Sequence, residues 1–130
     1  MEKKQSHLAF GKYAEQAACD YLMRQGLQLL RNNYRCLQGE IDIIMQDKDD
    51  IVFVEVRARG NKEPGSALES ITQHKIKKVI KTAKHFLLQR NCLYTITSRF
   101  DVVTLQPRNN SAQDRLSWKI EWIKNAFWEN

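Results

Sequence analysis

Hydrophobic residues recur at intervals of three and four in two segments of the chain, and this spacing marks one face of an α-helix. The first segment runs from about residue 6 to residue 25, and Gly26 follows it as a natural stop. The second runs from about residue 72 to residue 89, with most of its lysines off the apolar stripe. The pattern therefore predicts two amphipathic helices.

Shorter apolar runs between these helices predict strands. A weak run at 27–30 is followed by a polar connection at 31–35. Two stronger runs lie at 40–46 and 51–58, and an acidic turn at 47–50 joins them. We expect the two stronger runs to form a β-hairpin.

Two more strands are expected after the second helix, at about 99–105 and 116–122. The segments 60–66 and 109–114 are rich in turn-forming residues and predict surface loops. The order is helix, three strands, helix and one or two strands. It predicts an α/β fold with a mixed central sheet flanked by helices, in one domain over residues 1–130.

The composition agrees with one globular domain, since the 130 residues are 42% hydrophobic. The opening MEKKQSHLAF contains no apolar leader, and no apolar run is long enough to cross a bilayer. We therefore expect a soluble cytoplasmic protein with no membrane partner. Cys19, Cys36 and Cys92 are far apart and form no metal-binding motif, so free thiols are expected.

The charge is unevenly distributed. Lysine and arginine exceed the acids by 21 − 15 = +6, yet residues 70–100 contain no acid and residues 39–55 are strongly acidic. A basic segment of this kind is typical of polyanion binding, although a solvated helix face explains the charges equally well. The candidate nucleic-acid-binding residues are Lys75, Lys77, Lys78, Lys81 and Lys84.

Three acids lie inside the two hairpin strands. If the hairpin is symmetric about its turn, opposed positions sum to 97, so Asp42 faces Glu55 and Glu40 faces Arg57. Directly opposed Cβ atoms lie about 4.5–5.5 Å apart, so Asp42 and Glu55 would repel each other or share one cation. Mg²⁺ takes one or two carboxylates in this way. Ordinary ion pairs with Arg57 on the strand surface are the alternative.

These motifs resemble the YraN family of uncharacterised bacterial proteins. The resemblance rests on Gly39-Glu40-Ile41-Asp42, Val52-Phe53-Val54-Glu55-Val56-Arg57 and Arg99-Phe100-Asp101-Val102-Val103, together with Glu15 and Lys75. It covers nearly the whole chain. It implies a restriction-endonuclease-like αβββαβ core of the PD-(D/E)XK type, related to archaeal Holliday-junction resolvases.

The resemblance also implies roles for individual residues. Asp42 would be the first metal-binding carboxylate, Glu55 the second, and Glu15 a further acid supplied by the first helix. One position departs from the motif, because its usual lysine is Arg57 here. Arginine can bind phosphate but stays protonated, so any role that requires loss of a proton is excluded, and cleavage would be slower or would rely on a metal-bound water or on another lysine such as Lys75.

The sequence therefore favours a nuclease that uses Mg²⁺ or Mn²⁺ and acts on structured or branched DNA. Asp42, Glu55 and Arg57 would be catalytic, and no segment has the character of a base-reading element. A binding module with weak or no activity is the alternative, and an interaction protein that docks through its Trp-rich end is a third hypothesis. Trp118, Trp122, Phe127 and Trp128 would stack on bases, join the core or contact a second copy in a homodimer.

Overall fold

The computed structural model describes residues 2–58, 71–108 and 117–129, with side chains from residue 10 onward. Within these ranges two helices and five strands follow one another in the predicted order. The elements are α1 (Glu2–Arg24), β1 (Gln28–Cys36), β2 (Gly39–Asp47), β3 (Asp50–Ala58), α2 (Gln73–Gln89), β4 (Ser98–Pro107) and β5 (Trp118–Phe127).

The five strands form one mixed sheet in the order β1-β2-β3-β4-β5. β3 and β4 are parallel, and the other three neighbouring pairs are antiparallel. A parallel pair needs a crossover connection, and α2 provides it between β3 and β4. The predicted α/β architecture with a mixed central sheet is confirmed.

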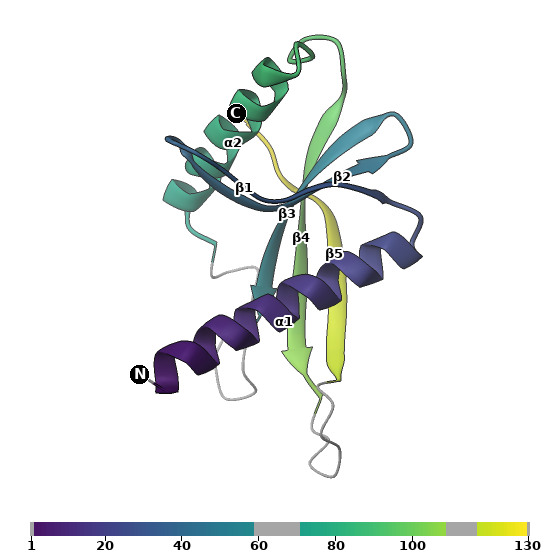
Figure 1. Cartoon of the computed structure of the whole chain (residues 1–130). Helices are drawn as coiled ribbons and strands as arrows, with labels where there is room; N and C mark the ends of the chain where they lie inside the picture. Colours follow the sequence, from purple (N-terminus) through teal and green to yellow (C-terminus); the bar gives the residue numbers. More distant parts are fainter. Residues whose placement is uncertain (1, 59–70, 109–116, 130) are drawn as a thin grey trace.

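The two helices cover opposite faces of this sheet (Figure 1). On β3, Val52 and Val54 pack with the residues of α1, whereas Phe53 packs with those of α2. This alternation follows from the strand geometry, which directs successive side chains to opposite faces. Both cores are therefore built on β3, the central strand.

The first strand differs from its prediction. We expected a strand at 27–30 and a polar connection at 31–35, but β1 continues to Cys36 and pairs with β2 over its whole length. β1 is an edge strand whose main chain bonds to one neighbour, so polar side chains do not prevent its pairing. A register shift between Leu29 and Arg31, and a positive φ of 51° at Asn33, interrupt the alternation that would have indicated a strand.

Gly39 allows β2 to begin close to α2. Its φ is 150°, and a Cβ atom there would lie 3.0 Å from Thr82 Oγ1 and 3.7 Å from Lys78 Cβ. The first of these distances is shorter than normal van der Waals contact, so a side chain would push the strand off the helix. The glycine therefore holds the strand that carries Asp42 against the helix that carries Lys75.

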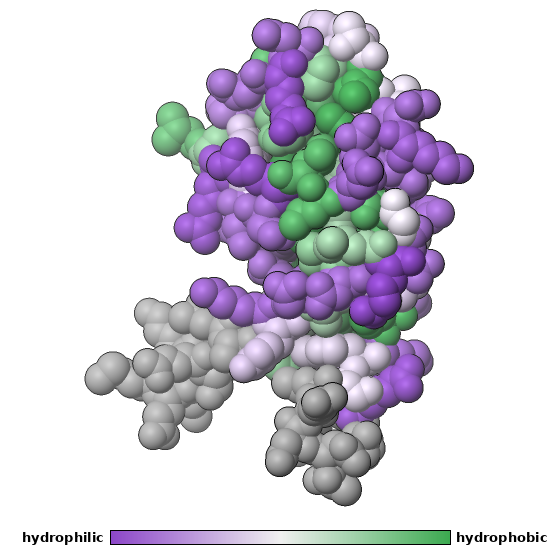
Figure 2. Space-filling model, turned by 45° about the vertical axis from the view of Figure 1, so that its right-hand side comes forward, coloured by the Kyte–Doolittle hydropathy of each residue, from purple (hydrophilic) through white to green (hydrophobic). Residues whose placement is uncertain are grey.

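The surface is mostly hydrophilic. Figure 2 shows one face on which hydrophobic residues reach the surface as a strip between hydrophilic side chains. No helix in the described ranges is long and apolar enough to cross a membrane. The loops predicted at 60–66 and 109–114, and Leu116 of the last predicted strand, lie outside the described residues.

Candidate metal and phosphate site

The candidate site lies where β2 and β3 separate. Their pairing has the predicted register from Asp47–Asp50 to Ile43–Val54. Beyond that point β2 continues beside β1, and β3 continues beside β4. Asp42 and Glu55 are the next residues on the two strands, so they lie at the mouth of the opening.

Where the strands separate, backbone N–H groups no longer pair with the neighbouring strand. They face carboxylate oxygens instead. Val56 N donates to Asp42 Oδ2 at 2.8 Å, and Asp42 N lies 3.4 Å from Glu55 Oε2. Glu55 is 1% exposed. The two acids therefore bridge the strands at the point where main-chain pairing stops.

The negatively charged form of both carboxyl groups is disfavoured. Burial raises the pKa of Glu55 to about 8, and the neighbouring charge of Asp42 contributes to that rise, against the opposing effect of Lys75. Burial likewise raises the pKa of Asp42, although the hydrogen bond from Val56 opposes the increase. A buried pair of acids with raised pKa values is common in functional sites, because it favours a proton or a cation.

Lys75 supplies positive charge to this pair. Its Nζ lies 3.3 Å from Glu55 Oε1, and its side chain remains 39% exposed. Thr72 caps α2, and its Oγ1 accepts a hydrogen bond from Lys75 N at 3.1 Å. The cap positions the first turn of α2, with Lys75 on it, beside Glu55.

Arg57 is two residues after Glu55 on β3 and is partly buried. Its Nε is buried and has no hydrogen-bond partner among the described residues. A buried charged donor without an acceptor is costly. The residue is nevertheless only partly buried, so its guanidinium is a candidate donor to an anionic ligand such as a phosphate.

The prediction that Glu40 faces Arg57 is wrong. β2 has already left β3 at that point, and Glu40 instead pairs with Arg35 of β1, with Arg35 Nε 3.4 Å from Glu40 Oε2. The ion pairs with Arg57 that were considered as an alternative do not form within the described residues.

Glu15 approaches from α1. The Asn33 amide nitrogen, when it faces the carboxylates, lies 3.2 Å from Glu15 Oε1 and 3.2 Å from Glu40 Oε1. Burial, with the charges of Asp42 and Glu40, raises the pKa of Glu15. Glu15 also borders a cavity of about 260 Å³ between α1 and β1. It is near enough to Asp42 to interact electrostatically, but its hydrogen bonding is directed to Asn33.

The predicted metal ligands are therefore brought to one region without forming a complete cluster. Within the described ranges, no group of three or more acids, histidines or cysteines is arranged to hold a metal ion. Asp42 and Glu55 form the close pair, and Glu15 contributes charge from the neighbouring helix.

The predicted DNA-binding lysines fall on different sides of α2. Residues two apart on a helix differ by about 200° in direction, so Lys77 points away from the side that carries Lys75. Lys77 and Lys81 border a cavity of about 250 Å³ beside Trp128.

The other two lysines have separate positions. Lys84 forms an ion pair with Glu129 near the C-terminus. Lys78 is exposed, and the base of its side chain lies beside Gly39 at the start of β2. Lys75 is thus the lysine of the set that contacts the acidic pair.

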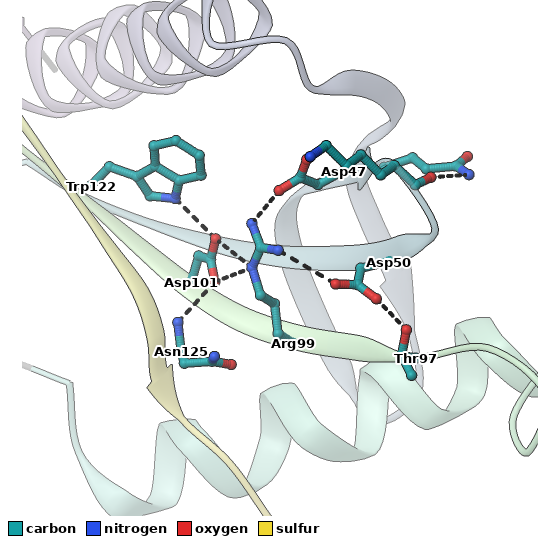
Figure 3. Close-up of polar contacts among 9 residues, drawn as sticks. Asp47, Asp50, Thr97, Arg99, Asp101, Trp122 and Asn125 are labelled. Atoms are coloured by element: carbon teal, nitrogen blue, oxygen red, sulfur yellow. Dashed lines mark hydrogen bonds and ion pairs between the residues drawn. The ribbon is translucent and has the colours of Figure 1, made fainter.

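The Arg99-Phe100-Asp101 motif belongs to a different cluster (Figure 3). Asp101 is fully buried and accepts hydrogen bonds from Arg99 Nε at 3.1 Å and Trp122 Nε1 at 2.9 Å. Arg99 also reaches Asp47 and Asp50 at the turn between β2 and β3. These contacts join β4 and β5 to the turn of the hairpin, so the motif has a structural role.

The sequence reasoning missed Asn33, which lies in the segment predicted as a connection. Asparagine tolerates positive φ, and the pair Asn32-Asn33 would have indicated an irregular backbone position there. Nothing in the sequence indicated that its amide would contact Glu15 of α1 and Glu40 of β2.

Comparisons with known proteins identify relatives over nearly the whole chain. The model of a family described as "Uncharacterised protein family UPF0102" matches residues 14–105. A UPF0102 protein of Legionella pneumophila is 43% identical over 117 residues, which cover 90% of this chain and 92% of the relative. Another from Pseudomonas fluorescens is 44% identical over 122 residues, covering 94% of this chain and 95% of the relative.

Proposed function

Because the chain belongs to the uncharacterised protein family UPF0102, the YraN family, we propose a function from the site itself: a divalent-metal-dependent endonuclease that cleaves structured or branched DNA. The predicted membership of this family is confirmed. The observation that carries the proposal is the close pair of Asp42 and Glu55, with Lys75 in contact with Glu55 and Arg57 two residues further along β3.

The donor chemistry of this pair fits a hard cation. Carboxylate oxygens are the ligands that Mg²⁺ and Mn²⁺ prefer, and burial raises the pKa values of both acids, with the charge of Asp42 adding to the rise at Glu55. Asp42 and Glu55 would hold the ion, with Glu15 assisting from α1. When bound, such an ion would activate water and stabilise the negative charge that develops on phosphorus.

Two cationic side chains would bind the scissile phosphate. Arg57 has a buried donor that lacks an acceptor in the described part of the chain, and a phosphate oxygen would satisfy it. Lys75 is bound to Glu55 but remains partly exposed, so a cation at Glu55 would free its ammonium for the substrate. Arg57 stays protonated, so its role would be charge stabilisation and phosphate orientation.

This arrangement supports a PD-(D/E)XK nuclease core of the restriction-endonuclease-like type, as the motifs imply. The exposed lysines of α2 would bind backbone phosphates, a kind of contact that is independent of sequence. DNA with a branch or another structural irregularity is the substrate we propose, without strong sequence preference.

A cleavage screen tests the function. Duplex, single-stranded, flap and four-way-junction substrates would be incubated with Mg²⁺ or Mn²⁺, and with a chelator as the blank. We expect metal-dependent cleavage of at least one structured substrate, and its loss in Asp42→Asn and in Glu55→Gln. Glu121→Gln, an exposed change on β5, is the matched control and should cleave normally. Cleavage at the original rate in Asp42→Asn would contradict the proposed site.

The second candidate is a nucleic-acid-binding module with weak or no nuclease activity. Arg57 favours it, because arginine at this position cannot act as a base. This candidate predicts salt-sensitive binding without cleavage under any metal tested. An interaction protein, the third hypothesis, predicts neither binding nor cleavage.

A further inference from the structure

A groove runs between α2 and the C-terminal segment, and neither acid of the pair lines it. It consists of two adjoining cavities, of about 250 and 260 Å³, that share Ile80, Trp128 and Glu129. We call it the Trp128 groove. On the α2 side it is bordered by Ile76, Lys77, Ile80 and Lys81, and on the other side by Trp128 and Glu129.

The groove combines an exposed aromatic ring with positive charge. The Trp128 residue is 67% exposed, and Trp118 and Trp122 are less exposed and pack against the α1 side of the sheet. Lys77 and Lys81 are exposed beside Trp128. The one acid in the groove, Glu129, is already paired with Lys84.

This combination matches the chemistry of a single nucleic-acid strand. Proteins bind such strands by stacking bases on aromatic rings while basic residues neutralise the backbone. Inside an intact duplex both faces of each base are covered by its neighbours, so an exposed indole stacks most readily on an unpaired base. An acidic peptide would satisfy the lysines, but it would not require the flat face of an indole.

The groove begins at the same helix end as the acidic pair. Gln73 borders the groove and lies in the first turn of α2, which also carries Lys75 beside Glu55. A strand that leaves the acidic pair would therefore pass the N-terminus of α2 and enter the groove.

We propose that the Trp128 groove binds an unpaired strand next to the cleaved bond, with Trp128 stacking on a base and Lys77 and Lys81 on phosphates. This inference rests on the proposed nuclease function and deepens it. If the groove binds in this way, the protein should prefer substrates with a single-stranded arm to perfect duplexes.

Binding of a labelled oligothymidylate to the full chain, in chelator to prevent cleavage, tests the groove. Trp128→Ala should weaken binding about 5- to 150-fold, since one base–aromatic stack contributes about 1–3 kcal/mol. Trp128→Phe should retain most of the affinity. The slope of the logarithm of the binding constant against the logarithm of the salt concentration should become less steep by about 1.4 in the double variant Lys77→Ala, Lys81→Ala. Each lysine would account for about 0.7, the value for one phosphate contact on a single strand.

Lys119→Ala is the matched charge control, because Lys119 is exposed at the far end of β5 from the groove. Unchanged oligothymidylate affinity in Trp128→Ala would overturn the inference. Tighter, Trp128-dependent binding of polyglutamate than of oligothymidylate would also overturn it and assign the groove to an acidic protein partner.

The outcomes separate this inference from the nuclease function. Normal oligothymidylate binding by the groove variants, with metal-dependent cleavage that is lost in Asp42→Asn, would refute the groove and leave the nuclease. Weakened binding by those variants, with no cleavage by the original protein, would support the groove and refute the nuclease.

Discussion

Glu55 shows how one residue can make a site unstable without its ligand. Its carboxyl is almost fully buried, faces Asp42 and, within the described ranges, forms an ion pair with Lys75. The pKa of about 8 means that the folded chain retains a proton on this group at neutral pH in the absence of a cation. Ionisation of Glu55 therefore opposes folding.

The stability of the metal-free protein should consequently fall with pH. The pKa of Glu55 rises from an ordinary value of 4.5 to about 8 on folding, so the folded state binds the extra proton between these values. The free energy of unfolding should be highest below about pH 4.5 as far as this group is concerned, and should decrease up to about pH 8. Glu55→Gln should remove that decrease.

Urea denaturation in chelator over this pH range measures the effect. Glu121→Gln, on the exposed side of β5, should keep the original pH dependence. An identical pH profile in the original protein and in Glu55→Gln would show that Glu55 ionises normally.

Asp42 gives a second prediction, for the metal. Asparagine retains an oxygen that can accept the Val56 N–H, so Asp42→Asn should leave metal-free stability unchanged or raise it, because it removes a buried charge that opposes the ionisation of Glu55. Mg²⁺ or Mn²⁺ should stabilise the original protein by about 2.7 kcal/mol at 100 times the dissociation constant. The variant should lose most of this gain.

Thermal melts with chelator and with a titrated divalent ion provide the measurement. A structural ion pair would behave in the opposite way, because removal of one partner would destabilise the metal-free protein. Equal metal-induced shifts in the two proteins would exclude Asp42 as a ligand.

Arg57 gives a third prediction at this scale. If its guanidinium binds the scissile phosphate, Arg57→Ala should lower the single-turnover cleavage rate by about 100- to 1000-fold, the range for loss of one donor that stabilises transition-state charge. Arg57→Lys should retain or raise cleavage, because it restores the usual lysine of the motif. An alanine variant that cleaves at the original rate would assign Arg57 a role unrelated to phosphate binding.

At the scale of elements, the Arg99-Asp101 cluster joins β4 and β5 to the turn between β2 and β3. Trp122 of β5 donates to Asp101 of β4, and Arg99 joins Asp101 to the β2–β3 turn. Trp122→Phe should destabilise the protein by about 1–3 kcal/mol, because the buried carboxylate loses a donor. Trp128→Phe, at an exposed position, should change stability by less than about 0.5 kcal/mol. Urea midpoints compare the two, and equal values would show that the indole bond to Asp101 contributes little.

The elements were predictable to different degrees. The hairpin register followed from the apolar alternation and the acidic turn, so the approach of Asp42 to Glu55 was predictable from residue counting. β1 was only partly predicted, because an edge strand with a bulge loses its alternation. Glu40 was misassigned because nothing in the sequence marks the residue at which paired strands separate.

At the scale of the whole molecule, prediction was limited by contacts between distant elements. The α/β order could be derived from periodicity, whereas the neighbours of each lysine, Glu55 for Lys75 and Trp128 for Lys77, became visible only once the helix was seated on the sheet. The buried Arg57 donor and the bridge from Asn33 to two acids depend on the same tertiary packing. Residue spacing alone contains no information on these contacts.

The crossover through α2 has a consequence for the order in which the chain folds. Asp42 and Glu55 are joined by a short hairpin, and hairpins of this kind form within about 1–10 μs. Lys75 reaches Glu55 only after α2 has packed on the sheet between β3 and β4. Contacts between segments this far apart in the sequence form more slowly. We therefore expect a folding chain to bring its two acids together before their counter-charge arrives, so acidic solution or a divalent ion would ease the earliest step.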